Sequence, residues 1–529
     1  FLVFLAISFQ EQVAGCLIPY ITSAFGQHAL LSSVSIASST FSAASKLPLA
    51  AIVDAFGDRN TYQCMVFLCV LGIILIPLCP NIWMYTGSKI FYSVGDGAIA
   101  YILNISLIRR TSLLNRTLFF ALAESPYTIN SFTGPVAAEL LLTHGGLSLG
   151  FVVVASVTLL SCICTTRFIF DYDRASLSLA PVRQLFKGEA SIFSTAKFDA
   201  VGIMLCSLSF IVVLVPLSFL HTLDKMWLVM YIAASAVCII LFIAWRWLGA
   251  PVPFLAADLL RNQTALLACL TGLELWISFF LYDTYLMSYL QVAHGLDLAY
   301  AGFLSSTYNI SSCVGSLLAG CYVLRSSHMK RLALAAALLQ GLSILLMLYF
   351  CRPNGSIAYL TSGRVINGVA CGVLVCCAQT TAMAAAKKQH SQPGDRYAPP
   401  MSQPIRPETS KRDEVIYLAL VGIFDSAGGS IGQSFAGIIY GLNMPQLLQQ
   451  YLPNNAKGLW KEIYSSMKMQ MKWPIGTRIR DSVVRSSVET HGYLLEAALV
   501  VMLLEIPSIL CWEDIDLVAV EANKEDHVA

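Results

Sequence analysis

The feature that most constrains this chain is a series of apolar stretches, each about as long as a helix that crosses a membrane. A helix needs roughly 20 apolar residues to span the hydrocarbon core. The stretches lack strand-like alternation, and backbone groups in lipid must be satisfied internally, so helices are the structure that remains. Only 12% of the 529 residues are charged, against about 25% in a soluble domain. The sequence therefore predicts an all-α integral membrane protein with fourteen transmembrane helices, over residues 1–23, 29–52, 61–79, 82–107, 119–142, 147–168, 198–220, 227–248, 263–290, 300–324, 330–350, 355–386, 415–440 and 491–511.

Basic residues are distributed unevenly over the connections between these stretches. The short connections after odd-numbered stretches hold only Lys225 and Arg352, and those after even-numbered stretches hold most of the others. Because cytoplasmic loops carry an excess of lysine and arginine, we expect the even connections and both termini in the cytoplasm. Phe1 already lies inside the first stretch, so we expect a cytoplasmic segment before it. The polar residues around Glu11 argue against a signal peptide.

The order of the stretches predicts two six-helix halves, residues 1–168 and 263–511, with two extra helices between them, residues 198–248. We also expect a cytoplasmic linker, a cytoplasmic proline-rich loop, an extracellular loop with aromatic residues and a cytoplasmic tail, over residues 169–197, 387–414, 441–490 and 512–529. This 6+2+6 order resembles the fourteen-helix transporters of the major facilitator fold. In that fold the substrate site lies near the midplane between the halves.

Composition also excludes several kinds of site. The sixteen cysteines lie mostly inside the apolar stretches, and none has a histidine at the spacing of a metal site. We therefore expect no bound metal and no cofactor. A net charge of +2 is too small to favour a nucleic-acid partner. The lipid bilayer is the partner that composition predicts.

Charged residues inside the stretches are candidates for function, because each costs roughly 2.5–3.5 kcal/mol at a helix centre. Glu124 opens the segment AESPYTINSFTGP, in which Pro126 can kink the helix. A carboxylate beside a kink suits a proton-coupled step. The alternative, that Glu124 is an ordinary carboxylate at the cytoplasmic end of a helix, explains the sequence equally well. Asp96 lies two turns from Lys89 on one helix face, so it could carry a proton or form a structural pair. The candidates for proton coupling are Glu124, Asp283 and Asp96.

The connection between the second and third stretches reads LAAIVDAFGDRNTY. It is similar to the loop signature of major facilitators through Asp54, Gly57 and Arg59, with Asp58 as an extra residue before the arginine. An aspartate and an arginine at helix ends can pair with groups on the other half and hold one conformation, so these residues are a candidate latch. The alternative is an ordinary charged loop.

Three tyrosines and a carboxylate gather in FLYDTYLMSYLQVAHGL, which ends the ninth stretch. Tyr282, Tyr285 and Tyr289 stand at i, i+3 and i+7, so on one continuous helix they would share a face. An aromatic belt at the membrane interface is one interpretation. The carboxylate in the same turn favours the other, a wall that faces a ligand. The candidates for substrate binding are Tyr282, Asp283, Tyr285, Tyr289, Gln291 and, in the predicted extracellular loop, Trp473.

Several segments together carry a more specific resemblance. The stretch YDTYLMSYLQVAHGL resembles the fungal siderophore–iron transporters of the major facilitator superfamily, and YITSAFGQHALLSSVSI, KLPLAAIVDAFG and WPIGTRIRDSVVRSSVETHGYLL are similar to other segments of that family. The resemblance implies proton-driven uptake of ferric siderophores across the plasma membrane or an endosomal vesicle membrane, and no enzymatic activity. A hexadentate chelator already saturates the iron, so such a transporter needs rings, amides and a large cavity rather than a cysteine and histidine site.

Two other functions stay open at this point. Gly134-Pro135 is similar to the core of an antiporter motif, which favours a drug–proton antiporter of the same fold. A non-transporting nutrient sensor is the second alternative, because the loop 387–414 could recruit a cytosolic partner.

Overall fold

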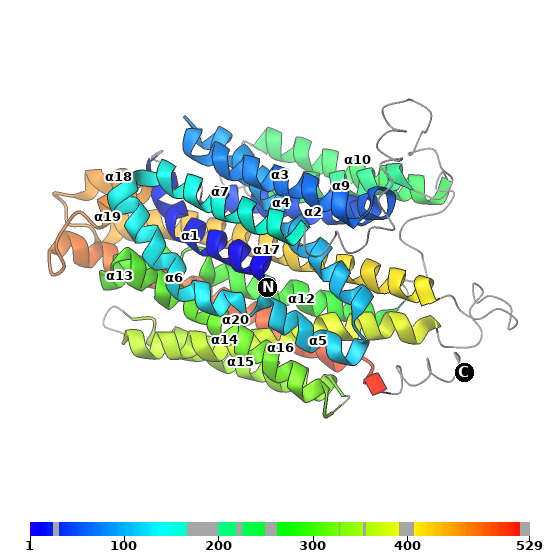
Figure 1. Cartoon of the computed structure of the whole chain (residues 1–529). Coiled ribbons are helices and arrows are strands. Elements are labelled where there is room, and N and C mark those ends of the chain that lie inside the picture. The colour runs from blue at the N-terminus through cyan, green and yellow to red at the C-terminus, as the bar shows by residue number, and fades with distance from the viewer. Residues whose placement is uncertain are drawn as a thin grey trace, which may run out of the picture.

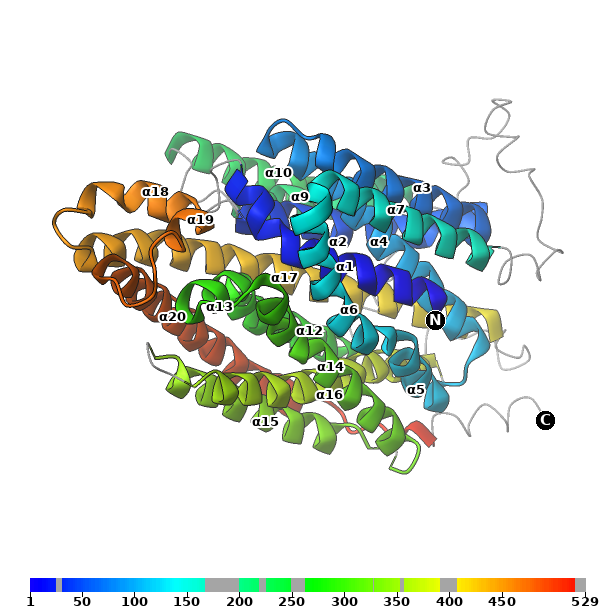
Figure 2. The same ribbon diagram turned by 60° about the vertical axis from the view of Figure 1, so that its left-hand side comes forward.

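A computed structural model describes residues 1–24, 31–166, 199–217, 225–248, 262–326, 328–352, 356–390 and 407–518. These described residues form helices, turns and one isolated bridge between His328 and Asp516. The helices lie side by side along one direction, with α18 and α19 at one end of the bundle and the described part of the C-terminal segment near the other (Figures 1 and 2). We call the end that carries α18 and α19 the α18 end, and we call the opposite end the Arg116 end, after a residue of α5.

Each predicted apolar stretch overlaps a helix. The N-terminal half contains α1 (Leu2–Ala24), α2 (Leu31–Phe56), α3 (Asp58–Leu75), α4 (Ile82–Arg110), α5 (Leu113–Glu124), α6 (Pro126–Leu140) and α7 (Gly146–Thr165). The two extra helices are α9 (Ala200–Leu217) and α10 (Lys225–Leu248). The C-terminal half contains α12 (Gln263–Asp283), α13 (Leu286–His294), α14 (Leu298–Val323), α15 (Lys330–Phe350), α16 (Ile357–His390), α17 (Pro407–Tyr451) and α20 (Arg478–Leu510).

The all-helical membrane class is confirmed, and the number of crossings stays a prediction. Among the described residues, 8 helices are long and apolar enough to cross a membrane, and three more segments are apolar but shorter. Two predicted stretches are each divided into two helices: 119–142 between α5 and α6, and 263–290 between α12 and α13.

The predicted loops are shorter in the structure than in the sequence analysis. α17 continues to Tyr451 and α20 begins at Arg478, so helix occupies both ends of the segment 441–490. Between them lie η7 (Lys457–Leu459), α18 (Trp460–Ser465) and α19 (Met467–Gln470). Hydropathy identifies the apolar part of a helix but not the polar turns at its ends, so the predicted loops came out longer than the observed ones. Residues 169–197, 391–406 and 519–529 lie outside the described residues.

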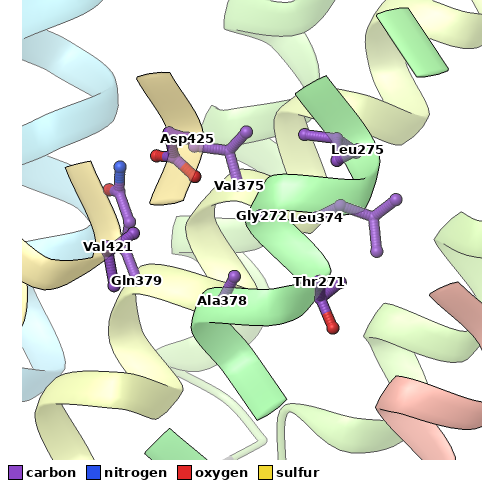
Figure 3. Close-up of a pocket in the computed structure, with 9 residues that line it drawn as sticks. All are labelled: Thr271, Gly272, Leu275, Leu374, Val375, Ala378, Gln379, Val421 and Asp425. Atoms are coloured by element: carbon purple, nitrogen blue, oxygen red, sulfur yellow. The ribbon is translucent and has the colours of Figure 1, made fainter. Parts of the chain in front are cut away.

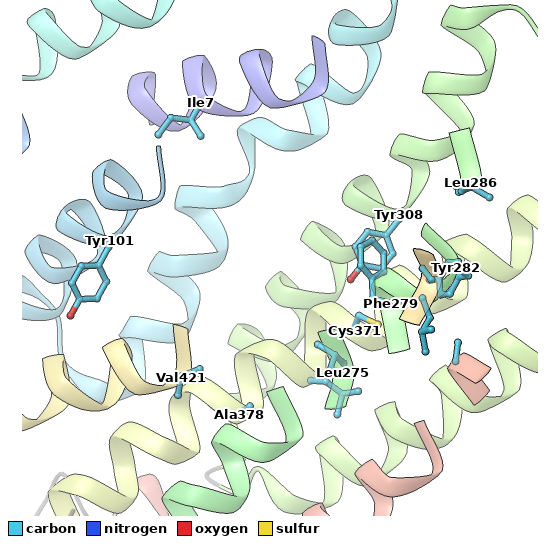
Figure 4. Packing of buried hydrophobic residues seen from close by; sticks show 14 of the residues in the cluster. Ile7, Tyr101, Leu275, Phe279, Tyr282, Leu286, Tyr308, Cys371, Ala378 and Val421 are labelled. Atoms are coloured by element: carbon cyan, nitrogen blue, oxygen red, sulfur yellow. The ribbon is translucent and has the colours of Figure 1, made fainter. Parts of the chain in front are cut away.

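The core is continuous through both halves. Ile7 and Tyr101 mark it in the N-terminal half, and Leu275, Phe279 and Val421 mark it in the C-terminal half (Figure 4). Glycines allow the closest helix crossings, as small residues do in membrane proteins. A Cβ on the glycines at 372 and 428 would lie 2.1 Å from the Ser312 carbonyl and 2.3 Å from the Leu273 carbonyl.

The two extra helices lie at the edge of the N-terminal half in both views (Figures 1 and 2). α9 packs against α2, where the Ser207 hydroxyl donates to the Ala44 carbonyl at 2.9 Å. α10 packs mainly against α9, and large apolar side chains such as Met226 and Trp247 remain exposed on it. An apolar surface of this kind suits contact with lipid.

Candidate functional site

The two halves meet at both ends of the bundle. At the Arg116 end, Arg116 of α5 and Glu414 of α17 form an ion pair of 2.9 Å whose side chains are 3% and 5% exposed. At the α18 end, the Ala299 amide of α14 donates to the Glu139 carboxylate of α6 at 3.1 Å, and Phe132 lies 5.1 Å from Phe303 between ring centroids. An anion at a helix N-terminus is favourable, so Glu139 stabilises the start of α14 from the other half.

A polar cluster lies inside the N-terminal half, formed by Gln10 and Glu11 of α1, Asp96 of α4 and Tyr127 of α6. The Gln10 amide donates to the Asp96 carboxylate, and the Tyr127 hydroxyl donates to the Glu11 carboxylate. The predicted candidate Asp96 therefore lies in a buried network of its own half, and is itself 7% exposed.

Glu124 is the last residue of α5, where the fifth predicted stretch is broken. Pro126 begins α6, and its missing amide hydrogen prevents the helix from continuing through this point. The carboxylate is exposed, and Glu11 is the charged neighbour whose field reaches it. The Glu124 carbonyl accepts from the Cys313 thiol of α14 at 3.4 Å, so the break lies against the other half.

Asp283 is the last residue of α12, where the ninth predicted stretch is broken. Its carboxylate pairs with Arg364 of α16 at 3.0 Å, and Arg364 also donates to the Ser305 carbonyl at 2.7 Å. The guanidinium carbon lies 5.9 Å and 5.7 Å from the ring centroids of Tyr282 and Tyr308. Arg364 Nε and Nη1 are buried without an acceptor among the described residues. Asp283 is one of the predicted candidates, and its partner Arg364 was not predicted.

The three tyrosines do not share one face, contrary to the prediction. Tyr282 donates to the Asn367 side chain of α16 at 3.1 Å. Tyr285 stacks on Tyr440 of α17, with ring centroids 4.0 Å apart, and Tyr289 stacks on His491 of α20 at 4.2 Å. The break at Thr284 is the reason, because spacing predicts a shared face only along an unbroken helix. The rings are 1% to 3% exposed, so in this conformation they are packed into the protein.

The remaining predicted substrate residues lie toward the α18 end. Gln291 of α13 is 1% exposed. The Arg480 side chain donates to the backbone carbonyl of Val292 at 2.7 Å and lies 3.5 Å from the carbonyl of Gln291. Arg480 also donates to the Gln470 carbonyl, so it ties α13 to the segment that carries α18 and α19. Trp473 is half-buried in the same segment. α19 lies against α1, so this segment touches both halves.

The structure offers no metal centre in the part of the chain that it describes. No group of three or more histidine, cysteine, aspartate or glutamate side chains could hold an ion there. Eight of the sixteen cysteines are buried, as small apolar packing residues are, and the other eight are half-buried or exposed. The groups that the site presents are rings, amides, carboxylates and arginine.

Comparison with known proteins decides the family. The model of the Major Facilitator Superfamily matches residues 1–392. The chain belongs to the major facilitator superfamily. It is therefore an integral, multi-pass membrane transporter and not an enzyme.

The curated relatives bear out the predicted resemblance. The chain is similar to the MFS siderochrome iron transporter D of Aspergillus fumigatus, 28% identical over 98% of this chain and 84% of that protein. It is 28% identical to the siderophore iron transporter mirB of Emericella nidulans over 93% of this chain and 78% of that protein. It is also 26% identical to the siderophore iron transporter 1 of Schizosaccharomyces pombe, over 94% and 78% of the two chains.

Solved structures share the fold at low sequence identity. A bacterial homologue of the human lysosomal transporter Spinster, in an inward-facing and unoccupied conformation, superposes with a TM-score of 0.57 at 12% identity, over 99% of this chain and 96% of that one. A peptide transporter in complex with alafosfalin superposes with a TM-score of 0.55 at 13% identity, over 96% and 92%. These likenesses concern the fold alone.

The superfamily loop signature lies at the Arg116 end. Gly57 alone joins α2 to α3 with φ of +81°, a conformation that favours glycine. Asp58, the extra residue of the signature, pairs with Arg109 of α4 at 2.7 Å within the N-terminal half. Arg59 is half-buried in α3, and the side chain of Asp54 lies outside the described residues. The latch role of Asp54, Gly57 and Arg59 stays a prediction. Contacts between the halves at this end include the Arg116–Glu414 pair, which was not predicted, and the hydrogen bond between Thr117 and Thr380.

Proposed function

We propose that this chain imports ferric siderophores by symport with protons, through alternating access between its two halves. The observation that carries the proposal is the similarity to siderophore iron transporters over nearly the whole chain, 98% of it in one case. The site chemistry agrees, because a chelate whose iron is already saturated presents oxygen atoms and apolar surface rather than open coordination positions. Rings, amides and arginine donors suit such a ligand.

The break between α12 and α13 is the proposed substrate wall. Arg364 supports this role, because two of its buried donors have no acceptor in the part of the chain that the structure describes, and it lies next to the rings of Tyr282 and Tyr308. A buried donor without an acceptor is costly, and an oxygen-rich ligand would supply one. Asp283 then positions the guanidinium. Tyr285, Tyr289, Gln291 and Trp473 would act nearer the α18 end, on the path that the chelate follows.

Three carboxylates are proposed for proton coupling, and the geometry favours Glu124. Asp283 has a cation at 3.0 Å, and Asp96 lies in a buried network. Glu124 is exposed at a helix break that lies against the other half. A site that exchanges protons must be reachable from water in at least one conformation, and of the three carboxylates Glu124 is the one that is exposed in this conformation. In the candidate latch, Gly57 would set the turn, and Arg59 and Asp54 would act together with the Arg116–Glu414 contact.

The orientation and the membrane belong to the same proposal. The short connections after even-numbered apolar stretches hold most of the basic residues, which supports a cytoplasmic position for both termini and for the Arg116 end by the positive-inside rule. The α18 end would then face the exterior or the lumen of an endosomal vesicle. Import from that side is what a siderophore transporter requires, in either the plasma membrane or an endosome.

Uptake of radioiron-labelled chelates by a host that lacks its own iron uptake tests the function. The proposal expects energy-dependent accumulation that requires the transported chelate, whereas free iron is not taken up. A drug–proton antiporter would lower drug accumulation and leave radioiron outside. Gly134 gives that alternative little support, because a Cβ there would lie 2.4 Å from the Cβ of Gln12, so packing explains the glycine. A nutrient sensor would move neither compound.

A further inference from the structure

A lysine of the N-terminal half reaches into the C-terminal half near the middle of the bundle. Lys46 of α2 donates to the Gly422 carbonyl of α17 at 2.8 Å and to the Ser426 hydroxyl at 2.9 Å. Ser39 of α2 continues the same contact one step along α17, where it meets Ser430 at 2.8 Å. A lysine inside a membrane is costly, so its presence between the two halves needs a reason.

Among the described residues, Lys46 is the cation whose field reaches the carboxylate of Asp425. Asp425 precedes Ser426 on α17, and the fields of Lys46 and Asp425 act on each other. Asp425 lines a narrow crevice between α12, α16 and α17, together with the polar side chains of Thr271 and Gln379 and otherwise apolar groups (Figure 3). No water-sized sphere fits in this crevice. A hydrated cation or a chelate fragment is therefore excluded from it in this conformation, and a proton is not.

Two glycines make room for the charged atoms. A Cβ at Gly272 of α12 would lie 2.3 Å from Asp425 Oδ1, and a Cβ at Gly422 would lie 3.1 Å from Lys46 Nζ. Trp276, one turn after Gly272, lies near the same carboxylate. The site is thus built around the two charges.

The surroundings of Asp425 contain few titratable groups. Lys46 comes from α2, and Cys269 and Trp276 come from α12. α16 contributes the neutral Gln379, and among the described residues no side chain of α4, α9 or α20 lines the crevice. Protonation of Asp425 would therefore act mainly on one partner, the Lys46 ammonium.

We propose that Asp425 carries a coupling proton and that Lys46, on the opposite half, is the counter-charge that makes its protonation change the contact between the halves. The carboxylate takes up a proton in a conformation that opens the crevice to water on one side of the membrane, and releases it in the conformation that opens the crevice to the other side; only an O–H bond is made and broken. This inference rests on the proposed proton-coupled transport. It adds a residue to the three carboxylates named above.

The placement of the pair explains why it can couple. A ligand shifts a conformational equilibrium only by its different affinity for the two states. Asp283 has its cation on its own half, and the charged neighbour of Glu124 is on its own half too. Such neighbours can stay in place when the halves move. Lys46 leaves Asp425 when the halves separate, so the affinity of Asp425 for a proton differs between the two states.

Amide hydrogen exchange on the purified protein tests the inference without any chelate. Exchange in peptides of α2 and α17 is compared at acidic and neutral pH, corrected for the intrinsic rates. The wild type should show a pH-dependent difference, and Asp425→Asn should remove it. Gly272→Ala should also reduce it, because the new methyl group displaces the carboxylate while the charge remains. Gly87→Ala is the matched control, since a Cβ there meets nothing within 4 Å.

Uptake separates this inference from the proposed function. Asp425→Asn should lower chelate accumulation under a gradient of one pH unit by up to about tenfold, since a pH unit corresponds to a factor of ten, and leave chelate exchange intact. If the wild type accumulates no chelate but Asp425→Asn removes the pH-dependent exchange, the transported compound is wrong and Asp425 keeps its role. A pH-dependent difference that persists in Asp425→Asn and in Gly272→Ala overturns the inference, whatever uptake shows. If Asp425→Asn does not fold, Gly272→Ala decides.

Discussion

The two broken helices can be compared directly, because each half ends a helix at a carboxylate. In the N-terminal half, Glu124 ends α5 and the break is enforced by Pro126. In the C-terminal half, Asp283 ends α12 without a proline, and the Thr284 hydroxyl bonds the Phe280 carbonyl at 2.6 Å. Asp283 has Arg364 at 3.0 Å, whereas Glu124 is exposed and has no ion pair among the described residues. The same local design therefore gives one charge that is fixed by its partner and one that is exposed without an ion pair among the described residues.

The largest loss of stability should come from breaking the Asp283–Arg364 pair. Arg364→Ala leaves Asp283 buried without its cation, and loss of one partner of a buried pair typically costs about 3–5 kcal/mol. We expect a strong fall in thermal stability and in the amount of protein at the membrane. Asp283→Asn in the same chain should restore part of the stability, because it removes the unpaired charge. Equal melting temperatures for the single and double variants would contradict the pairing.

A cross-half pair should respond differently from a pair within one half. Arg116→Ala removes the cation that joins α5 to α17, so we expect the Arg116 end to open while the folded halves persist. The measurement is the rate at which a membrane-impermeant thiol reagent modifies a cysteine introduced by Thr117→Cys, which lies beside Thr380 of the other half. The rate should rise several-fold. An unchanged rate with a lowered melting temperature would make the pair purely structural.

The exposed carboxylate should affect coupling and not stability. Glu124→Gln keeps the size of the side chain and removes its proton exchange, so pH-driven accumulation should fall by up to about tenfold per pH unit of gradient. Chelate exchange and melting temperature should stay near wild type. Glu489→Gln is the control, a carboxylate paired with Arg485 at the surface. Retention of full pH-dependent accumulation in Glu124→Gln would remove Glu124 from the coupling step.

The smallest effects are expected from the stacked rings beside the second break. Tyr285→Ala and Tyr289→Ala each lose an aromatic contact worth about 0.5–1.5 kcal/mol, which corresponds to a two- to tenfold weaker half-saturation for the chelate at most. Uptake is measured against chelate concentration and normalised to surface protein, with Tyr285→Phe as the variant that keeps the stack on Tyr440. An unchanged half-saturation with reduced abundance would leave the rings a packing role only.

Part of the fold and of the two helix breaks could be predicted from the sequence. Apolar stretches predicted the helices and their order, because crossing a membrane depends on local composition. Pro126 predicted a kink at Glu124, and the structure has a break there. Nothing in Asp283-Thr284-Tyr285 announces a break, so the shared face of the tyrosines was predicted wrongly. The sequence did contain one clue to the Asp283–Arg364 pair. Burying a carboxylate costs free energy unless a cation is near it, and Arg364 is a cation in another apolar stretch.

Pairs that join distant parts of the chain could not be predicted. Arg116 and Glu414 are separated by 298 residues, and neither lies in a recognisable motif. Asp58 looked like an interruption of the loop signature, and it pairs with Arg109 at the end of α4. Lys46 and Asp425 were visible as charges in apolar stretches, but only the packing of α2 against α17 brings them together.

Vesicles that contain the purified protein test the central claim most directly. A proton gradient is imposed, radioiron-labelled ferric siderophore is added outside, and the internal concentration is followed with and without a protonophore. The account predicts accumulation above the external concentration, loss of that accumulation with the protonophore, and proton entry that depends on the chelate. Accumulation that ignores the gradient, or vesicles in which no chelate moves while the protein remains folded, would contradict it.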